Sequence, residues 1–348
     1  MRFNRMIKVV GCHAEGEVGD VIVGGILPPP GETVFEQRRA FERDQDHLRR
    51  LLICEPRGSV ARHVNLIVPP KRSDCVAGAI IMEPTEYPPM SGSNTICIVT
   101  VLLETGMAPM IEPVTRLRLD MPAGPVDVEA ECRDGKCIAV KFENVPCFAH
   151  EIGVPLTLET GETITIDIAY GGMIYALAEV SQFGLSVAPE HGRRLAEIGE
   201  AIRRAARRQY PDVMHPENPE IRGVSIVQLH EAFTGVGGAS RNTCIVAPGR
   251  CDRSPTGTGL SARLAVLHAK GLLKAGDSFA HDSIIGSRFE GKIERETTIA
   301  GRPAIIPSIR GRAWITGFSD YVIDPTDPYP AGYVISDTWG TSTKVTQD

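Results

Sequence analysis

The residues best suited to chemistry lie in two short polar loops, each of which precedes an apolar segment of helical length. The first loop includes Ser91, and its helix is predicted to end near Gly106. The second runs from Asp252 to Gly259 and includes Thr256, and its helix is predicted to end at Gly271. The start of a helix presents unpaired N–H groups and about half a positive charge. Each loop could therefore hold an anion beside a hydroxyl group.

Either loop alone is explained by helix capping, because Ser, Thr and Gly favour that position. Their placement favours a site shared by the two loops, since Ser91 and Thr256 are separated by nearly half of the 348 residues. Two such helix ends acting together could hold one carboxylate and present a hydroxyl to each face of the molecule that bears it. Other catalytic motifs are absent or incomplete. Gly257-Thr258-Gly259 lacks the full dinucleotide-binding spacing, and neither a phosphate-binding loop nor a GxSxG elbow occurs.

The elements around the loops follow the same order in both halves of the chain. In the first half, a helix is predicted over 36–52, and strands are predicted within 7–26, 66–68 and 77–82. In the second half, an amphipathic helix is predicted over 190–210, and strands over 163–169, 224–229 and 243–247. The pattern indicates an α/β protein of two similar domains. We place them at 1–163, with Ser91, and 164–329, with Thr256, and expect 330–348 to pack on the first.

The composition argues against several functional classes. The net charge is −6, so no basic footprint for a nucleic acid or an anionic membrane is expected. The four arginines at 203, 204, 207 and 208 are interpreted as a solvated helix face. The longest apolar run, 96–103, is far shorter than the roughly 20 residues of a membrane span. The nine cysteines show no CxxC pair or zinc spacing, so we expect reduced thiols, no metal and a cytoplasmic location.

At its two loops the chain resembles the proline racemase family, and the resemblance runs nearly end to end. The segment Asp252–Gly259 matches the family's D-R-S-P-C-G-T-G at all but one position, and 12–17 resembles D-x-H-T-x-G-E without the Thr. Further matches are Glu55-Pro56-Arg57-Gly58, Ala169-Tyr170-Gly171-Gly172, His215-Pro216, Phe233-Thr234, Arg241-Asn242, 315–317 and 324–328. The resemblance implies two similar diaminopimelate-epimerase-like domains with the active site in the cleft between them, and no cofactor.

The departures from the family pattern concern the two reactive positions. Family racemases use two cysteines, one per domain, as base and acid on opposite faces of Cα. Ser91 and Thr256 stand at those positions here, and Ser93 replaces the usual His. A threonine hydroxyl is a far weaker acid than a thiol, whose reference pKa is about 8.5. Threonine at the second position resembles the trans-3-hydroxy-L-proline dehydratases. Serine at the first position also occurs in family enzymes that epimerise 4-hydroxyproline and dehydrate 3-hydroxyproline, so both departures are compatible with dehydration and only the serine with epimerisation.

The resemblance thus implies a hydro-lyase that converts trans-3-hydroxy-L-proline to Δ1-pyrroline-2-carboxylate. Ser91 would remove the Cα proton, and Thr256 would hydrogen-bond the departing hydroxyl. Asp252 would bind the ring nitrogen, and the carboxylate would be held by backbone N–H groups of Gly92, Ser93, Gly257 and Thr258. His13 and Glu15 are candidates for activating Ser91, although structural roles are the simpler interpretation of His13 and His215.

Two alternatives remain open from the sequence. One is 4-hydroxyproline 2-epimerisation, which takes trans-4-hydroxy-L-proline to cis-4-hydroxy-D-proline, alone or together with dehydration. The other is a non-catalytic family member that binds an imino acid, for which the loss of both cysteines is the main support. In each case the partner is a small molecule, and the oligomeric state, a homodimer included, is left open.

Overall fold

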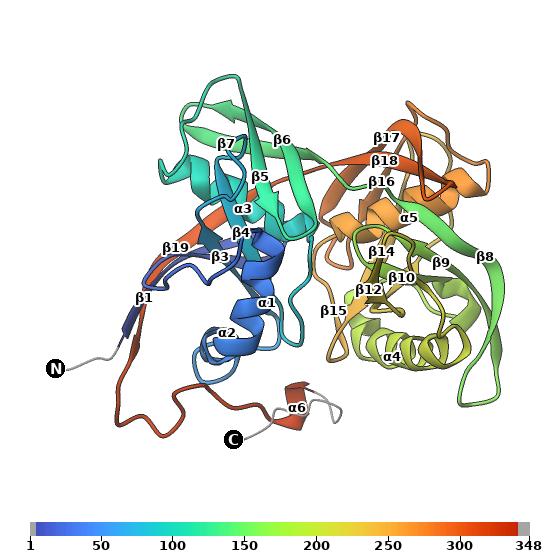
Figure 1. Cartoon of the computed structure of the whole chain (residues 1–348). Helices are drawn as coiled ribbons and strands as arrows, with labels where there is room; N and C mark the ends of the chain where they lie inside the picture. Colours follow the sequence, from blue (N-terminus) through green and yellow to red (C-terminus); the bar gives the residue numbers. More distant parts are fainter. Residues whose placement is uncertain (1–4, 340–348) are drawn as a thin grey trace. The chain divides into compact units, whose positions relative to one another are not determined.

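The chain forms two compact α/β units, seen in a computed structural model that describes residues 5–339 (Figure 1). The first unit comprises 1–141 and 312–348, and the second comprises 142–311. The chain therefore enters the second unit once and returns to the first with its final segment. Each unit is built on a mixed sheet and one fully buried helix.

The first unit is held together by hydrogen bonds between neighbouring strands in the order β19, β1, β2, β3, β4, β5, β6. Its strands are β1 (Arg5–Ala14), β2 (Glu17–Gly24), β3 (Arg62–Val68), β4 (Ala77–Met82), β5 (Val114–Met121), β6 (Gly124–Arg133), β7 (Lys136–Glu143), which continues past the unit boundary, and β19 (Ala313–Ile323). Its helices are α1 (Val34–Asp44), α2 (Asp46–Ile53), α3 (Gly92–Glu104) and α6 (Ser336–Trp339).

The second unit has the corresponding ladder β8, β9, β10, β13, β14, β16, β17, β18. Its strands are β8 (Phe148–Thr157), β9 (Thr163–Tyr170), β10 (Ile174–Glu179), β11 (Met214–His215), β12 (Asn218–Arg222), β13 (Ile226–His230), β14 (Ala239–Val246), β15 (Arg250–Cys251), β16 (Ser278–Asp282), β17 (Arg288–Ile299) and β18 (Arg302–Gly311). Its helices are α4 (Gly192–Gln209) and α5 (Gly257–Ala269), with short 3-10 turns η1 (Val180–Phe183) and η2 (Pro189–His191).

The two ladders repeat the same directions of pairing, which confirms the predicted internal similarity. From β1 to β6 the pairings run antiparallel, parallel, antiparallel, parallel, antiparallel. The series from β9 to β17 is identical. In each unit the chain forms a helix between the two strands of the second parallel pair. This helix is α3, between β4 and β5, in the first unit and α5, between β14 and β16, in the second. Each of these helices carries one of the two loops identified from the sequence.

The unit boundaries differ from the division drawn from the sequence, which placed them at 163/164 and 329/330. Strand pairing explains the difference. β8 forms a hairpin with β9 and so belongs to the second unit, and β19 pairs with β1 along its length and so belongs to the first. Trp339 is buried in the core of the first unit with residues of α1 and α2. The remainder of the predicted packing segment, 340–348, lies outside the described residues.

Both loop-bearing helices are buried because most of their residues are apolar or small. Every residue of α3 from Gly92 to Leu103 is buried, as is every residue of α5 from Gly257 to Leu267. Glycines let strands approach them closely. A Cβ on Gly19 in β2 would lie 2.8 Å from Asn94 Oδ1, and a Cβ on Gly171 would lie 2.2 Å from the Thr258 carbonyl oxygen. The starts of both helices are therefore fixed against their sheets.

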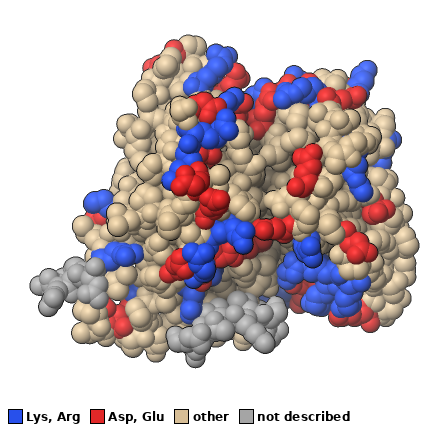
Figure 2. Space-filling model, in the orientation of Figure 1, with Lys and Arg blue, Asp and Glu red and all other residues tan. Residues whose placement is uncertain are grey.

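The outer helices follow ordinary sequence rules. Thr33 and Glu36 form a capping box at the start of α1. α4 buries one face, which includes Leu195 and Ile202, as the periodicity predicted. Its arginines lie among carboxylates: Arg208 is 2.8 Å and Arg204 3.5 Å from Glu159. On the face of the molecule in Figure 2, Lys and Arg side chains are interspersed with Asp and Glu.

Candidate active site

The hydroxyl of Ser91 lies at the start of α3. Ser91 is the N-cap residue, with extended backbone angles, but its side chain makes no capping bond to the helix. The first intrahelical bond runs from Thr95 N to Ser91 O at 3.0 Å. The amide groups of Gly92 and Ser93 therefore lack partners within the helix, as expected for a helix N-terminus. This end of α3 can bind an anion beside a hydroxyl that is free from capping.

A buried amide connects Ser91 to a histidine. Asn94 Nδ2 donates to Ser91 Oγ at 3.0 Å and lies 3.3 Å from His63 Nδ1. Asn65 Nδ2 donates to Asn94 Oδ1 at 2.9 Å, which fixes the orientation of the Asn94 amide. Both protons of the Asn94 amide are then directed at acceptors, so His63 Nδ1 is an acceptor and Nε2 carries the proton. Negative charge on Ser91 Oγ would be stabilised by this donor and by the helix terminus.

Two carboxylates flank the same histidine. Glu17 Oε1 lies 3.5 Å from His63 Nε2, and Glu83 Oε1 lies 3.6 Å from His63 Nδ1. All three side chains are almost fully buried. The residues behind Ser91 therefore form a polar network inside an otherwise apolar core, which is costly unless its members satisfy one another.

The sequence did not identify this network, and its two candidates for activating Ser91 have other partners. His13 Nδ1 accepts from the Gly16 amide at 3.1 Å, and its ring stacks on Trp314. Glu15 Oε1 accepts from Arg312 Nε at 3.0 Å. One signal for His63 was present: in strand β3 a His and an Asn occur two residues apart among apolar residues. Such alternation places both side chains on one face of the strand.

The hydroxyl of Thr256 lies at the start of α5 in a different setting. Thr256 Oγ1 donates to Asp252 Oδ2 at 2.7 Å, and the other oxygen of Asp252 accepts from Ser254 N at 2.8 Å. The backbone of Thr256 has φ 58° and ψ 102°. A positive φ is a genuine outlier for a β-branched residue, and such strain clusters at functional sites. The Thr256 proton is directed at a carboxylate, so its lone pairs remain for another group.

Among the residues that the structure describes, no pair beside Thr256 corresponds to Asn94 and His63. Three positions after Thr256 stands Gly259, whose Cβ, if present, would lie 2.8 Å from Gln228 Nε2 and 2.9 Å from Cys244 Sγ. Gln228 Nε2 is 3.8 Å from that sulfur. Burial raises the pKa of the Cys244 thiol, so it is a neutral group. The two hydroxyls, equivalent by topology, therefore have chemically different neighbours.

The predicted site residues gather in two groups, one in each unit. Ser91, Gly92 and Ser93 meet at the start of α3, and all three are buried. Asp252, Thr256, Gly257 and Thr258 meet at the start of α5, where Thr258 Oγ1 lies 2.6 Å from Tyr175 Oη. We call these groups the Ser91 half-site and the Thr256 half-site.

Between residues 5 and 339, no group of three His, Cys, Asp or Glu side chains could hold a metal ion. Over the same residues, no helix is long and apolar enough to cross a membrane. The nine cysteines are all free thiols.

Comparison with known proteins places these features in one family. The family model for proline racemase matches residues 9–334. A hydroxyproline epimerase from Agrobacterium vitis, solved with bound trans-4-hydroxy-L-proline, is 43% identical. The match covers 98% of each chain, with a TM-score of 0.91. A probable proline racemase from Agrobacterium radiobacter K84, solved with bound carbonate, is 42% identical over 96% of this chain and 98% of that one, with a TM-score of 0.91.

More distant proteins share the fold alone. A phenazine biosynthesis protein of the PhzF family from Bacillus anthracis is 12% identical, with a TM-score of 0.56. That match covers 93% of this chain and all of the other. The predicted fold class is thus confirmed, and the chain belongs to the proline racemase family.

Proposed function

We propose that the protein catalyses the cofactor-independent dehydration of trans-3-hydroxy-L-proline to Δ1-pyrroline-2-carboxylate. The proposal rests on the different hydrogen bonding of the hydroxyl groups in the two half-sites. Ser91 accepts a hydrogen bond that can stabilise charge on its oxygen, whereas Thr256 donates a hydrogen bond to Asp252. Dehydration needs one group that exchanges a proton at Cα. Epimerisation needs a second such group, and a threonine hydroxyl is a poor one.

The reaction assigned to Ser91 conserves atoms and charge. In its anionic state, Ser91 Oγ takes the Cα proton, and the electron pair released at Cα forms the double bond to C3 as the C3–O bond breaks. Ser91 returns its proton to the departing hydroxide, so water leaves and the serine is restored. The resulting enamine tautomerises to Δ1-pyrroline-2-carboxylate. The Asn94 amide and the N-terminus of α3 favour the anionic state of Ser91.

The remaining predicted residues would bind the substrate. Backbone N–H groups of Gly92, Ser93, Gly257 and Thr258 would hold the carboxylate and the charge that develops at Cα. Asp252 would keep the ring nitrogen cationic, which acidifies the Cα–H bond. Thr256, whose hydroxyl donates to Asp252, would accept a hydrogen bond from the substrate, a change from the donor role implied by the resemblance.

A second candidate function is 2-epimerisation of 4-hydroxyproline. The observation that favours it is the 43% identity to a hydroxyproline epimerase over almost the whole chain. Under this alternative Thr256, with the carboxylate of Asp252 behind it, would deliver a proton to the second face of Cα.

Incubation in D2O with a panel of proline, 3-hydroxyproline and 4-hydroxyproline stereoisomers separates these functions. We expect pyrroline formation from trans-3-hydroxy-L-proline. Inversion of trans-4-hydroxy-L-proline with deuterium at Cα and no loss of water would establish epimerisation in its place. If no isomer loses water or gains deuterium, while one still binds, the protein is a binding member of the family. Ser91→Ala should lose every activity, whereas Ser73→Ala, an exposed serine of the same unit, should not.

A further inference from the structure

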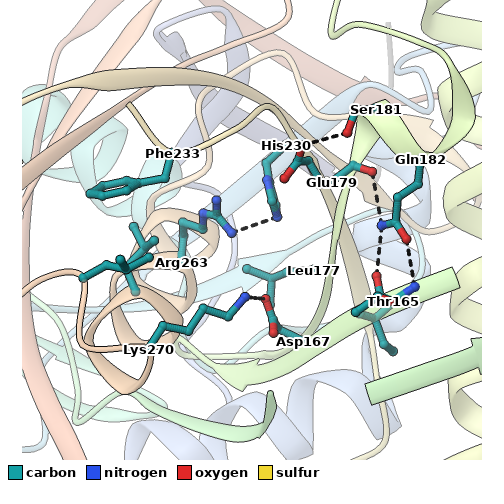
Figure 3. A pocket seen from close by; sticks show the side chains of 13 residues that line it. Thr165, Asp167, Leu177, Glu179, Ser181, Gln182, His230, Phe233, Arg263 and Lys270 are labelled. Carbon is teal, nitrogen blue, oxygen red and sulfur yellow. Dashed lines mark hydrogen bonds and ion pairs between the residues drawn. The ribbon is translucent and has the colours of Figure 1, made fainter. Parts of the chain in front are cut away.

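A cavity in the second unit lies beside the C-terminal half of α5, and none of its lining residues belongs to the Thr256 half-site (Figure 3). Its volume is about 370 Å³, within the range of small-molecule sites. Its walls include Arg263 of α5, Lys270 directly after the end of that helix, His230 at the end of β13, and Glu179 at the end of β10. Arg263 is seven residues past Thr256, which is about 10 Å along the helix. The function proposed above uses none of these residues.

Arg263 is a buried cation whose hydrogen-bonding partner is uncharged. Its side chain points at the His230 ring in Figure 3, and Nη1 donates to His230 Nε2 at 2.8 Å. His230 Nδ1 lies 2.9 Å from the Glu231 carbonyl oxygen, so it donates there, and the ring is neutral. Burial and the charge of Arg263 keep the pKa of His230 well below its usual value. Only 4% of Arg263 is exposed, and its buried Nε has no partner among the described residues.

The carboxylates around the cavity do not neutralise Arg263 by contact. Asp167 binds Lys270 Nζ at 2.7 Å and the Gly153 amide at 2.9 Å. Glu179 accepts from Ser181 Oγ at 2.7 Å. Neither carboxylate forms an ion pair with Arg263, although both raise its pKa from a distance. Burial is the larger effect and lowers the pKa of Arg263 to about 10. A guanidinium buried without a contacting anion is costly, and a ligand carboxylate would remove that cost.

The cavity therefore presents separated charges of opposite sign beside an apolar wall. Arg263 offers donors suited to a carboxylate, since its planar fork can form two parallel bonds. Glu179 has a second carboxylate oxygen that can accept from an ammonium group. Phe233, Leu177 and Leu267 supply apolar surface. We propose that this cavity is a second binding site, for a small aliphatic amino-acid zwitterion, whose carboxylate binds Arg263 and whose ammonium group binds Glu179.

The proposal is tested by isothermal titration of the full chain with three matched probes. L-leucine carries both charges, 4-methylpentanoate only the carboxylate, and isoamylamine only the ammonium group. We expect L-leucine to bind best, and Arg263→Gln to weaken it by about ten-fold or more, because a charge-assisted bond is lost. Arg288→Gln, which changes a surface arginine paired with Asp282, is the matched control and should bind normally.

The outcomes separate this site from the half-sites. Ser91→Ala should bind L-leucine as the wild type does, even if no hydroxyproline isomer is turned over. Unchanged affinity in Arg263→Gln, or no binding of L-leucine at all, overturns the proposal. Binding of 4-methylpentanoate as tight as that of L-leucine overturns the role of Glu179. If Arg263→Gln does not fold, Glu179→Gln serves instead, and it should weaken L-leucine but not 4-methylpentanoate.

Discussion

At the scale of single residues, the two hydroxyls occupy equivalent places but have opposite hydrogen-bonding roles. Ser91 Oγ accepts from an amide, whereas Thr256 Oγ1 donates to a carboxylate. An acceptor that is stabilised as an anion is suited to take a proton. A hydroxyl that already donates its hydrogen bond to a carboxylate is suited to accept one from a ligand. The chemistry of the Ser91 half-site thus depends on Asn94 and His63 behind it, whereas that of the Thr256 half-site depends on Asp252 of its own loop.

Asn94 is predicted to position and polarise Ser91. Asn94→Ala removes the donor to Ser91 Oγ, and we expect kcat to fall on the order of 10²-fold, as when one donor to a developing charge is removed. KM should change little. Thr95→Val is the matched control, because Thr95 is equally buried and its hydroxyl bonds the Ser91 carbonyl oxygen and Met90 Sδ but not Ser91 Oγ. Equal losses in both variants, with intact folding by circular dichroism, would show that Asn94 matters only for packing.

Thr256 is predicted to be the residue that prevents epimerisation. Thr256→Cys introduces a thiol, which is a far stronger acid than a hydroxyl, at a nearly unchanged side-chain volume. We expect the variant to gain measurable epimerisation of trans-4-hydroxy-L-proline, followed by optical rotation and by deuterium at Cα. Thr256→Ser is the control and should gain none. If the wild type already epimerises this substrate as fast as it dehydrates the 3-hydroxy isomer, Thr256 is not the determinant.

The predictability of the site at this scale depended on whether residues are neighbours in sequence. Ser91, Thr256 and the residues next to them could be identified because they form continuous loops. His63 and Glu83 reach the vicinity of Ser91 only through strand pairing between β3 and β4. A single sequence carries little information on such long-range contacts, so the network behind Ser91 was missed.

At the scale of elements, the ends of α3 and α5 were predictable because glycine has a special role there. Gly106 and Gly271 follow the two helices with φ of 73° and 70°, the left-handed conformation that commonly ends a helix. Apart from the two adjoining residues of the chain, no heavy atom of the described residues would lie within 4 Å of a Cβ at either position. A substitution there would thus be opposed by backbone conformation alone.

Gly106→Ala and Gly271→Ala are each predicted to destabilise the protein by about 1 kcal/mol, because alanine pays for the left-handed conformation. Gly192→Ala tests the same exchange in a helical conformation at the start of α4, also in open space. It should stabilise by up to about 1 kcal/mol. Urea unfolding followed by circular dichroism measures all three. A destabilising Gly192→Ala would contradict the conformational explanation.

At the scale of the whole molecule, the internal repeat was visible in the sequence but the unit boundaries were not. The repeated order of elements and loops follows local patterns of hydrophobicity, which a sequence displays directly. The unit to which β8 or β19 belongs depends on the strand with which it pairs, and β19 pairs with β1 from the opposite end of the chain. Such a long-range pairing leaves no local pattern in the sequence. The chain was therefore predicted to return to the first unit at residue 330, whereas it does so at residue 312.

The second unit also contains three histidines that burial keeps uncharged. Burial lowers the pKa of His150 to about 4 and that of His281 to about 3, and the pKa of His230 lies well below its usual value of 6.5. Between these values and 6.5, the folded unit binds fewer protons than the unfolded chain. Unfolding therefore takes up protons in this range, and the stability of the second unit falls as the pH drops below about 6.5.

The acid sensitivity of the second unit is predicted to decrease when one of these histidines is removed. His281 is fully buried, and each such group can contribute up to about 1.4 kcal/mol of stability loss per pH unit. In His281→Gln we expect the free energy of unfolding to fall less steeply between pH 6.5 and 4 than in the wild type, measured by urea titration and circular dichroism. Fluorescence follows the other unit separately, because both tryptophans, Trp314 and Trp339, lie in the first unit. Ile293→Val, a buried control in the second unit, should lower stability by a similar amount at every pH. Parallel curves for His281→Gln and the wild type would mean that His281 does not couple folding to pH.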